Sequence, residues 1–129
     1  MNIGVLDDNV TILSFLETTL EMDGHTVHSY TNGESLLQTI PNQSGVSLPY
    51  DLVILDLLLQ GKMSGADVFF ALRGRFDSWE LPIIIITAVG ESTLEQFRLI
   101  LPDDVPLLRK PFTPRELRQL MASITGNNP

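Results

Sequence analysis

The stretch from Tyr50 to Leu59, YDLVILDLLL, sets one acidic residue, Asp56, inside an otherwise apolar run. The four apolar residues Leu52 to Leu55 are typical of a parallel strand that is covered on both faces, because a strand with one wet face would alternate apolar and polar residues. Asp56 is therefore expected at the carboxyl end of a buried strand. In an open α/β sheet, ligands bind at that edge.

The composition limits the classes of protein that this chain can belong to. Its 129 residues, 43% of them hydrophobic, suit one domain with a real core. The net charge of −8 argues against direct binding to nucleic acid or to an anionic membrane. The absence of cysteine excludes disulfides and thiolate metal sites. No signal-peptide pattern opens the chain, and no apolar run approaches the ~18 residues of a membrane span, so we expect a cytoplasmic protein without membrane insertion.

Strand-like and helix-like segments alternate along the chain. Because parallel strands need a crossover helix, and the crossover is right-handed, five such pairs predict a doubly wound α/β fold with a five-stranded parallel sheet. The expected strands cover residues 2–6, 26–30, 52–56, 83–87 and 105–109, and the expected helices cover residues 9–23, 33–40, 65–76, 91–101 and 114–125. The polar, partly alternating strand 26–30 is expected at a sheet edge.

Several residues mark where the helices begin and end. Thr113 and Glu116 form a capping box with Pro114 between them, and Ser64 is expected to cap the third helix. Gly24 is expected to end the first helix. Trp79 is expected to cover the end of the third helix.

Five reactive side chains follow strand ends and reach the same rim of the predicted sheet. Asp7 and Asp8 follow the first strand, Asp56 ends the third, Thr87 ends the fourth and Lys110 follows the fifth. With strand order 2-1-3-4-5, the three carboxylates converge at the switch point of the sheet.

Such a cluster of carboxylates needs positive charge. At ~4 Å and an effective dielectric near 20, each like-charged pair costs about 4 kcal/mol. A hard cation such as Mg²⁺ suits the oxygen ligands, and Lys110 supplies a second positive charge. One carboxylate beside Mg²⁺ and an ammonium group is suited to attack phosphorus and form an aspartyl phosphate, to which the Thr87 hydroxyl could donate a hydrogen bond.

These motifs, together with the tripeptide Lys110-Pro111-Phe112, resemble the receiver domain of bacterial two-component response regulators, which has a flavodoxin-like (βα)5 fold. The resemblance covers residues 1–125, with 126–129 expected as a flexible tail and no output domain in the sequence. It implies that Asp56 is the phosphoacceptor and that the Lys110-Pro111 bond is cis.

The same resemblance assigns roles to the other residues at the rim. Asp7, Asp8 and Asp56 would hold Mg²⁺ together with the backbone carbonyl of Leu58. Thr87 would be the switch hydroxyl. Lys110 would contact the phosphoryl group.

The sequence departs from the family pattern at four positions. Leu107 stands where the family has Tyr or Phe, whose rotation reports phosphorylation. Leu58 and Val89 occupy positions that tune dephosphorylation, and because both are apolar we expect a long-lived phosphorylated state. Gln60 replaces the usual proline in a loop that is one residue longer than the commonest form.

The sequence thus favours a phosphorylation-controlled signalling switch that is not an enzyme. A sensor histidine kinase or phosphotransfer protein would phosphorylate Asp56, and a downstream protein would bind the face formed by the fourth helix, fifth strand and fifth helix. The chain either acts alone by binding or forms the N-terminal part of a longer protein. Two alternatives stay open: a receiver-like module that ignores phosphorylation, and a haloacid-dehalogenase-like phosphatase, which would need an acid where Leu58 stands.

Overall fold

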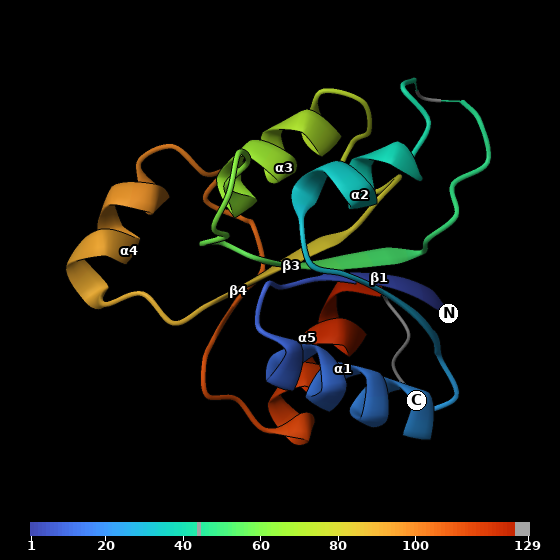
Figure 1. The fold of residues 1–129 in the computed structure, drawn as a ribbon, viewed down its shortest axis with the longest axis horizontal. Helices are drawn as coiled ribbons and strands as arrows, with labels where there is room; N and C mark the ends of the chain where they lie inside the picture. The colour runs from blue at the N-terminus through green and yellow to red at the C-terminus, as the bar shows by residue number, and fades with distance from the viewer. Residues whose placement is uncertain (44, 126–129) are drawn as a thin grey trace.

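A computed structural model describes residues 1–43 and 45–125, and the expected tail at 126–129 lies outside these residues. Within them, five strands alternate with five helices (Figure 1). The elements in chain order are β1 (Asn2–Leu6), α1 (Val10–Met22), β2 (Thr26–Tyr30), α2 (Gly33–Gln38), β3 (Leu52–Asp56), α3 (Gly65–Arg73), β4 (Ile83–Thr87), α4 (Glu91–Arg98), β5 (Leu107–Arg109) and α5 (Pro114–Thr125).

The strands form one parallel sheet in the order β2-β1-β3-β4-β5, which confirms the predicted topology. Leu6 pairs with Leu55, Asp56 pairs with Ile86, and Thr87 pairs with Arg109. The carboxyl ends of β1, β3, β4 and β5 are therefore level with one another. Residues that follow these strands meet at one edge of the sheet.

Helices cover both faces of the sheet, with α1 and α5 on one side and α2, α3 and α4 on the other (Figure 1). Alternate residues of each inner strand face opposite cores. Ile54 packs with the side chains of α1 and α5, whereas Val53 and Leu55 pack with those of α2, α3 and α4. Every residue of β3 and β4 is buried, and this explains their uninterrupted apolar sequences. Strand β2 lies at the edge, as its alternating sequence predicted.

Side chains cap the starts of three helices, and the caps predicted at Ser64 and Thr113 are confirmed. The side chain of Asn9 caps α1 by accepting hydrogen bonds from the Thr11 and Ile12 N–H groups. Ser64 forms a capping box with Asp67 at the start of α3. The box between Thr113 and Glu116 is also present at the start of α5.

Some predicted elements are longer than the real ones. Helix α3 ends at Arg73 and α4 at Arg98, and the residues after them continue in turns whose N–H groups donate to the third or the fourth residue back. Strand β5 begins at Leu107, two residues later than predicted. Pro106 has no N–H with which to extend the ladder, and it contributes only its carbonyl, which accepts from Ile85.

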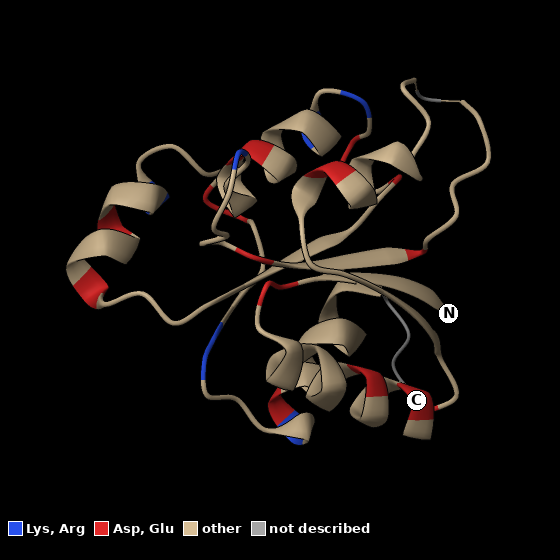
Figure 2. Ribbon diagram, viewed as in Figure 1, with Lys and Arg blue, Asp and Glu red and all other residues tan. Residues whose placement is uncertain are grey.

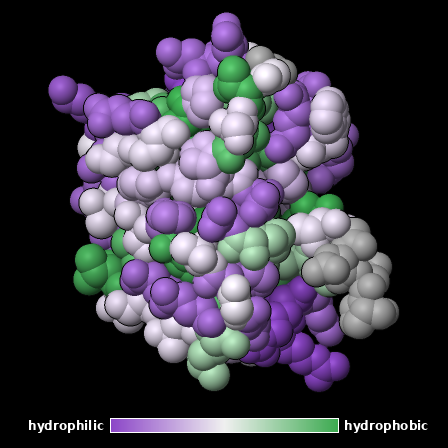
Figure 3. Space-filling view, turned by 90° about the vertical axis from the view of Figure 1, so that its right-hand side faces the viewer, coloured by the Kyte–Doolittle hydropathy of each residue, from purple (hydrophilic) through white to green (hydrophobic). Residues whose placement is uncertain are grey.

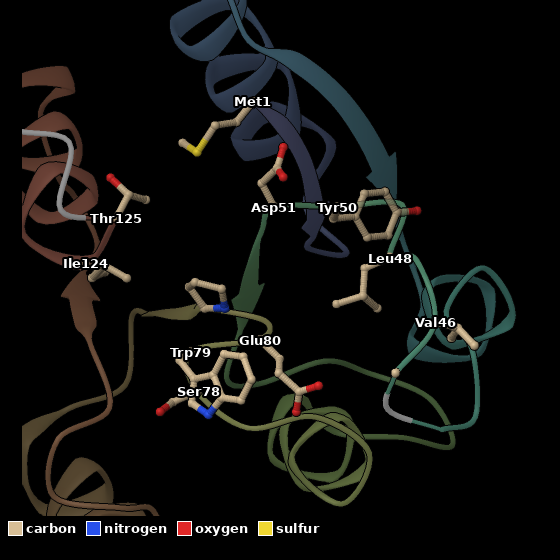
Figure 4. A pocket seen from close by; sticks show the side chains of 12 residues that line it. Met1, Val46, Leu48, Tyr50, Asp51, Ser78, Trp79, Glu80, Ile124 and Thr125 are labelled. Atoms are coloured by element: carbon tan, nitrogen blue, oxygen red, sulfur yellow. The ribbon is translucent and has the colours of Figure 1, made fainter.

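The prediction that Trp79 covers the end of α3 is wrong. Its side chain is 78% exposed and lines an open pocket of about 770 Å³ with Tyr50, Asp51 and Ile124 (Figure 4). The Trp79 ring borders this pocket and stays largely exposed to solvent, so it covers little of the helix. The pocket lies at the amino edge of the sheet, the face seen in Figure 3, where hydrophilic side chains surround separate hydrophobic patches.

Gly65, the first residue of α3, lies directly against the end of β3. A β-carbon at this position would lie 1.8 Å from the carbonyl oxygen of Asp56 and 2.6 Å from that of Leu57. The Gly65 N–H donates to the Leu57 carbonyl at 3.0 Å. A side chain therefore cannot fit at position 65 unless the backbone that carries Asp56 moves.

We predict that Gly65→Ala lowers the free energy of unfolding by about 3 kcal/mol, the upper end of the usual overpacking cost, because backbone atoms cannot rotate away from the added methyl group. Urea unfolding followed by circular dichroism measures the change. Gly90→Ala is the matched control, since a β-carbon there has no atom within 4 Å. Equal stabilities of the two variants would contradict the close approach.

Candidate functional site

Three carboxylates meet at the carboxyl edge of the sheet. Asp7 and Asp8 follow β1 and Asp56 ends β3, and one oxygen of each lies within 4.8 Å of the others. Figure 2 shows the acidic segments at the ends of β1 and β3 on the same side of the sheet. Asp7 and Asp56 are buried, whereas Asp8 is exposed. The site therefore contains two desolvated carboxylates and one carboxylate that solvent can reach.

Lys110 brings the positive charge that this cluster needs. Its Nζ donates to Asp7 Oδ2 at 2.7 Å and lies 3.6 Å from Asp56 Oδ2. The Lys110 backbone N–H donates to the Thr87 carbonyl at 2.7 Å, which ties the end of β5 to the end of β4. The Lys110-Pro111 peptide bond is cis, as the resemblance implied.

Backbone N–H groups hold two of the carboxylates in place. Asp7 accepts from the Asn9 N–H at 2.9 Å, and Asp8 accepts from the Gln60 N–H at 3.0 Å. Proline has no N–H, so the family's usual residue at this loop position could not make the second bond. Gln60, which replaces the family's usual proline, thus joins the loop after β3 to Asp8.

The pKa of the Asp56 carboxyl is raised to about 6. Burial is the main cause, because desolvation disfavours the charged form, and the negative charge of Asp7 adds to it. Lys110 and the backbone N–H of Leu58 act in the opposite direction. The protein therefore raises the proton affinity of Asp56.

Thr87 lies at the neighbouring strand end and is fully buried. Its hydroxyl oxygen accepts from the Val89 N–H at 3.1 Å. The side chain of Val89 is also buried, whereas that of Leu58 is 48% exposed. Leu107 is partly buried and packs against the core beneath α2, α3 and α4.

The donor set of the site fits Mg²⁺. This cation prefers oxygen ligands and keeps several waters, so it needs few protein groups. Each carboxylate oxygen has more than one lone pair, so the existing hydrogen bonds leave room for a cation. Sulfur and imidazole ligands, which would favour other metals, do not occur in the described cluster.

Sequence reasoning missed three groups at the site. The close approach of Gly65 depends on how α3 packs on β3, and the Gln60 bond depends on the path of a loop. Arg109 donates from Nη2 to the Val89 carbonyl at 3.2 Å. An arginine beside Lys110 reads as a surface charge in the sequence, so no local signal marked it.

The chain also matches known proteins. The family model for the response regulator receiver domain covers residues 3–122. The chain belongs to this family. Receiver domains act in two-component signalling and bind Mg²⁺ at an acidic pocket, which agrees with the clustered carboxylates found here.

Curated relatives of this receiver domain are response regulators and transcriptional regulators by name. It is 27% identical over 117 residues to the heme response regulator HssR of Staphylococcus epidermidis, an alignment of 91% of the chain and 48% of that protein. It is 31% identical over 120 residues to the alkaline phosphatase synthesis transcriptional regulatory protein PhoP of Bacillus subtilis, over 93% of the chain and 46% of that protein. The receiver domain thus spans about half the length of these relatives.

Solved structures share the fold. A CheY-like response regulator receiver domain protein from Methanospirillum hungatei superimposes with a TM-score of 0.78 at 22% identity, over 97% of this chain and 93% of the other. Among the described residues of the receiver domain, no helix is long and apolar enough to span a membrane.

We predict that Asp56→Asn stabilises the protein at neutral pH when a chelator keeps cations away. The folded-state pKa of about 6 lies above the ordinary value near 3.9, so ionising Asp56 costs stability as pH rises through this interval. The gain should be absent at pH 4 and reach about 1–3 kcal/mol at pH 7.5. Urea unfolding at both pH values measures it.

Asp103→Asn is the control, since it removes the same charge from an exposed side chain. We expect its effect to stay within about 0.5 kcal/mol at both pH values. A stabilisation by Asp56→Asn of the same size at pH 4 and pH 7.5 would argue against a raised pKa.

Proposed function

We propose that this receiver domain is a phosphoacceptor switch that takes a phosphoryl group onto Asp56 from the phosphohistidine of a cytoplasmic sensor histidine kinase or phosphotransfer protein. An Asp56 oxygen attacks phosphorus, the phosphorus–nitrogen bond breaks, and the imidazole leaves with a proton from solvent. The observation that carries the proposal is a buried carboxylate with a raised pKa, 3.6 Å from the Lys110 ammonium group and beside two further carboxylates.

Each neighbouring group has a task in this proposal. Asp7, Asp8 and Asp56, with the backbone carbonyl of Leu58, would hold Mg²⁺. When bound, the cation offsets the negative charge that the phosphoryl group brings. Lys110 holds the carboxylates before transfer and is close enough to donate to a phosphoryl oxygen afterwards.

Phosphorylation would change the surface through the loop after β4. The phosphoryl group adds a charge of about −1.5 to −2, which attracts the Thr87 hydroxyl and Lys110. A downstream protein would bind the face formed by α4, β5 and α5. Apolar side chains suited to a protein partner are exposed next to α4, since Leu99 and Ile100, directly after this helix, are 87% and 56% exposed.

Two other functions are less well supported. A phosphatase that works through an aspartyl phosphate would need an acid two residues after the nucleophile, and Leu58 has no group that transfers a proton. A module that ignores phosphorylation would have no need for Lys110 and two further carboxylates gathered around Asp56. Direct binding to nucleic acid is disfavoured by the net charge of −8.

We predict that radiolabelled acetyl phosphate labels the wild-type protein in Mg²⁺ but not in a chelator, and that Asp56→Asn takes up no label. Alkali and hydroxylamine should release the label, as expected for an acyl phosphate. Equal labelling of the two proteins would rule out Asp56 as acceptor. Sustained release of product from a generic phosphate ester would favour the phosphatase, and a protein that never labels would favour the phosphorylation-independent module.

We also predict a slow spontaneous loss of the label, because Leu58 and Val89 offer no polar group to orient the attacking water. Leu58→Asn should speed the loss by on the order of tenfold, less than the ~100-fold or more of a general base, because an amide orients water without taking its proton. The loss of radiolabel from purified phosphoprotein measures this. Leu99→Asn, which changes an exposed leucine away from the site, should leave the rate unaltered. Rapid loss from the wild type, with no change in Leu58→Asn, would refute the prediction.

A further inference from the structure

We propose that Arg109 is the positioning residue that couples the Thr87 loop to α4, in place of the aromatic side chain that is absent at position 107. The inference rests on the proposed function, because it describes how phosphorylation of Asp56 would reach the surface. It is carried by a chain of contacts that runs from Thr87 to the first turn of α4.

Arg109 holds the loop between β4 and α4 from its outer side. The guanidinium donates from Nη2 to the Val89 carbonyl at 3.2 Å, and Nη1 forms an ion pair with Glu91, the first residue of α4. The Arg109 backbone also lies beside Thr87 in the sheet register. One side chain thus connects the loop, the start of α4 and the end of β5.

Thr87 holds the same loop from its inner side. The Thr87 hydroxyl accepts from the Val89 N–H at 3.1 Å, in a buried position. Val89 is therefore bound through its N–H to Thr87 and through its carbonyl to Arg109. If the Thr87 hydroxyl turns toward a phosphoryl group on Asp56, the buried Val89 N–H loses its acceptor, and the peptide must move to find another.

That movement would reach Arg109 and then α4. The Val89 carbonyl belongs to the segment that moves, so its bond to Arg109 must change with it. Helix α4 is free to respond: its N-cap residue, Gly90, makes no side-chain capping bond, and Leu94 is its buried residue among those described. Figure 1 shows α4 at the side of the molecule, directly after β4 and its loop.

Leu107 cannot perform this task. Its side chain has no hydrogen-bonding group and packs against the core. Arg109, by contrast, is 45% exposed and its partner Glu91 is 70% exposed. Exposed ion pairs of this kind are weak, so a small movement of the loop is enough to separate Arg109 from Glu91. The positions of these two charges on the surface beside α4 would then change.

The test uses beryllofluoride as the phosphoryl analogue, added with Mg²⁺ to the full chain, with backbone amide NMR as the readout. In the wild type we expect saturable binding, seen in the ¹⁹F spectrum, and amide shifts along Glu91–Arg98. In Arg109→Gln we expect binding to persist while the amide shifts of α4 fall by more than half. The affinity should rise by at least about twofold, because the loop no longer resists the turn of Thr87.

The rise in affinity separates a positioning role from a merely structural one, since a loosened fold would bind more weakly. Arg109→Lys retains the charge and can keep one of the two contacts, so part of the α4 response should return. Arg118→Gln is the matched control: Arg118 is 48% exposed and pairs with Asp23, away from the loop. Its response should equal that of the wild type.

Each outcome has a distinct meaning. The amide shifts of α4 could be equal in the wild type and in Arg109→Gln when each protein is saturated with the analogue. That result overturns the role of Arg109 and leaves the proposed function intact. A wild-type protein that does not bind the analogue overturns the proposed function, and the inference falls with it. Weaker binding by Arg109→Gln, unrelieved in Arg109→Lys, shows a structural role and overturns the inference.

Discussion

The ion pair between Lys110 and Asp7 is the interaction on which the site depends. The Asp7 carboxylate is fully buried, and the Lys110 side chain is partly buried, with 14% of it exposed. Removing one member of a buried pair leaves an uncompensated charge, which typically costs 3–5 kcal/mol. The two residues are 103 positions apart, so their contact also fixes the end of β5 relative to the end of β1, across the ends of β3 and β4. The ion pair therefore needs the folded sheet to bring its two members together, and it in turn stabilises that sheet.

This pair leaves the site short of positive charge. One ammonium group faces three carboxylates, and its closest partner is Asp7, not Asp56. Burial and the negative charge of Asp7 make the ionised form of Asp56 costly, and the pKa of Asp56 is therefore raised. A bound cation would offset the negative charge that Lys110 leaves uncompensated. The same crowding of carboxylates thus underlies both the fit of this site to Mg²⁺ and the raised pKa of Asp56.

Much of this arrangement could be predicted from sequence, because strand ends and apolar runs are local signals. Asp56 and Thr87 follow buried strands, and the order of a doubly wound sheet brings such ends together. Trp79 was placed wrongly because its surroundings come from the packing of distant segments. The Arg109 contacts and the close approach of Gly65 were missed for the same reason: the groups they touch lie far along the chain or belong to the backbone. Sequence patterns report periodicity and caps, but they do not report such contacts.

Gly65 also makes the two sides of the site differ in stiffness. The first turn of α3 is pressed against the carbonyl of Asp56 without room for a methyl group, so the backbone on that side acts as a rigid wall. On the other side, the loop from Thr87 to Glu91 is held by hydrogen bonds and one exposed ion pair, which can be exchanged. A disturbance that begins at Asp56 meets a stiff boundary toward α3 and a compliant one toward α4. This difference in stiffness directs a change at Asp56 toward α4, along the side on which Arg109 is proposed to act.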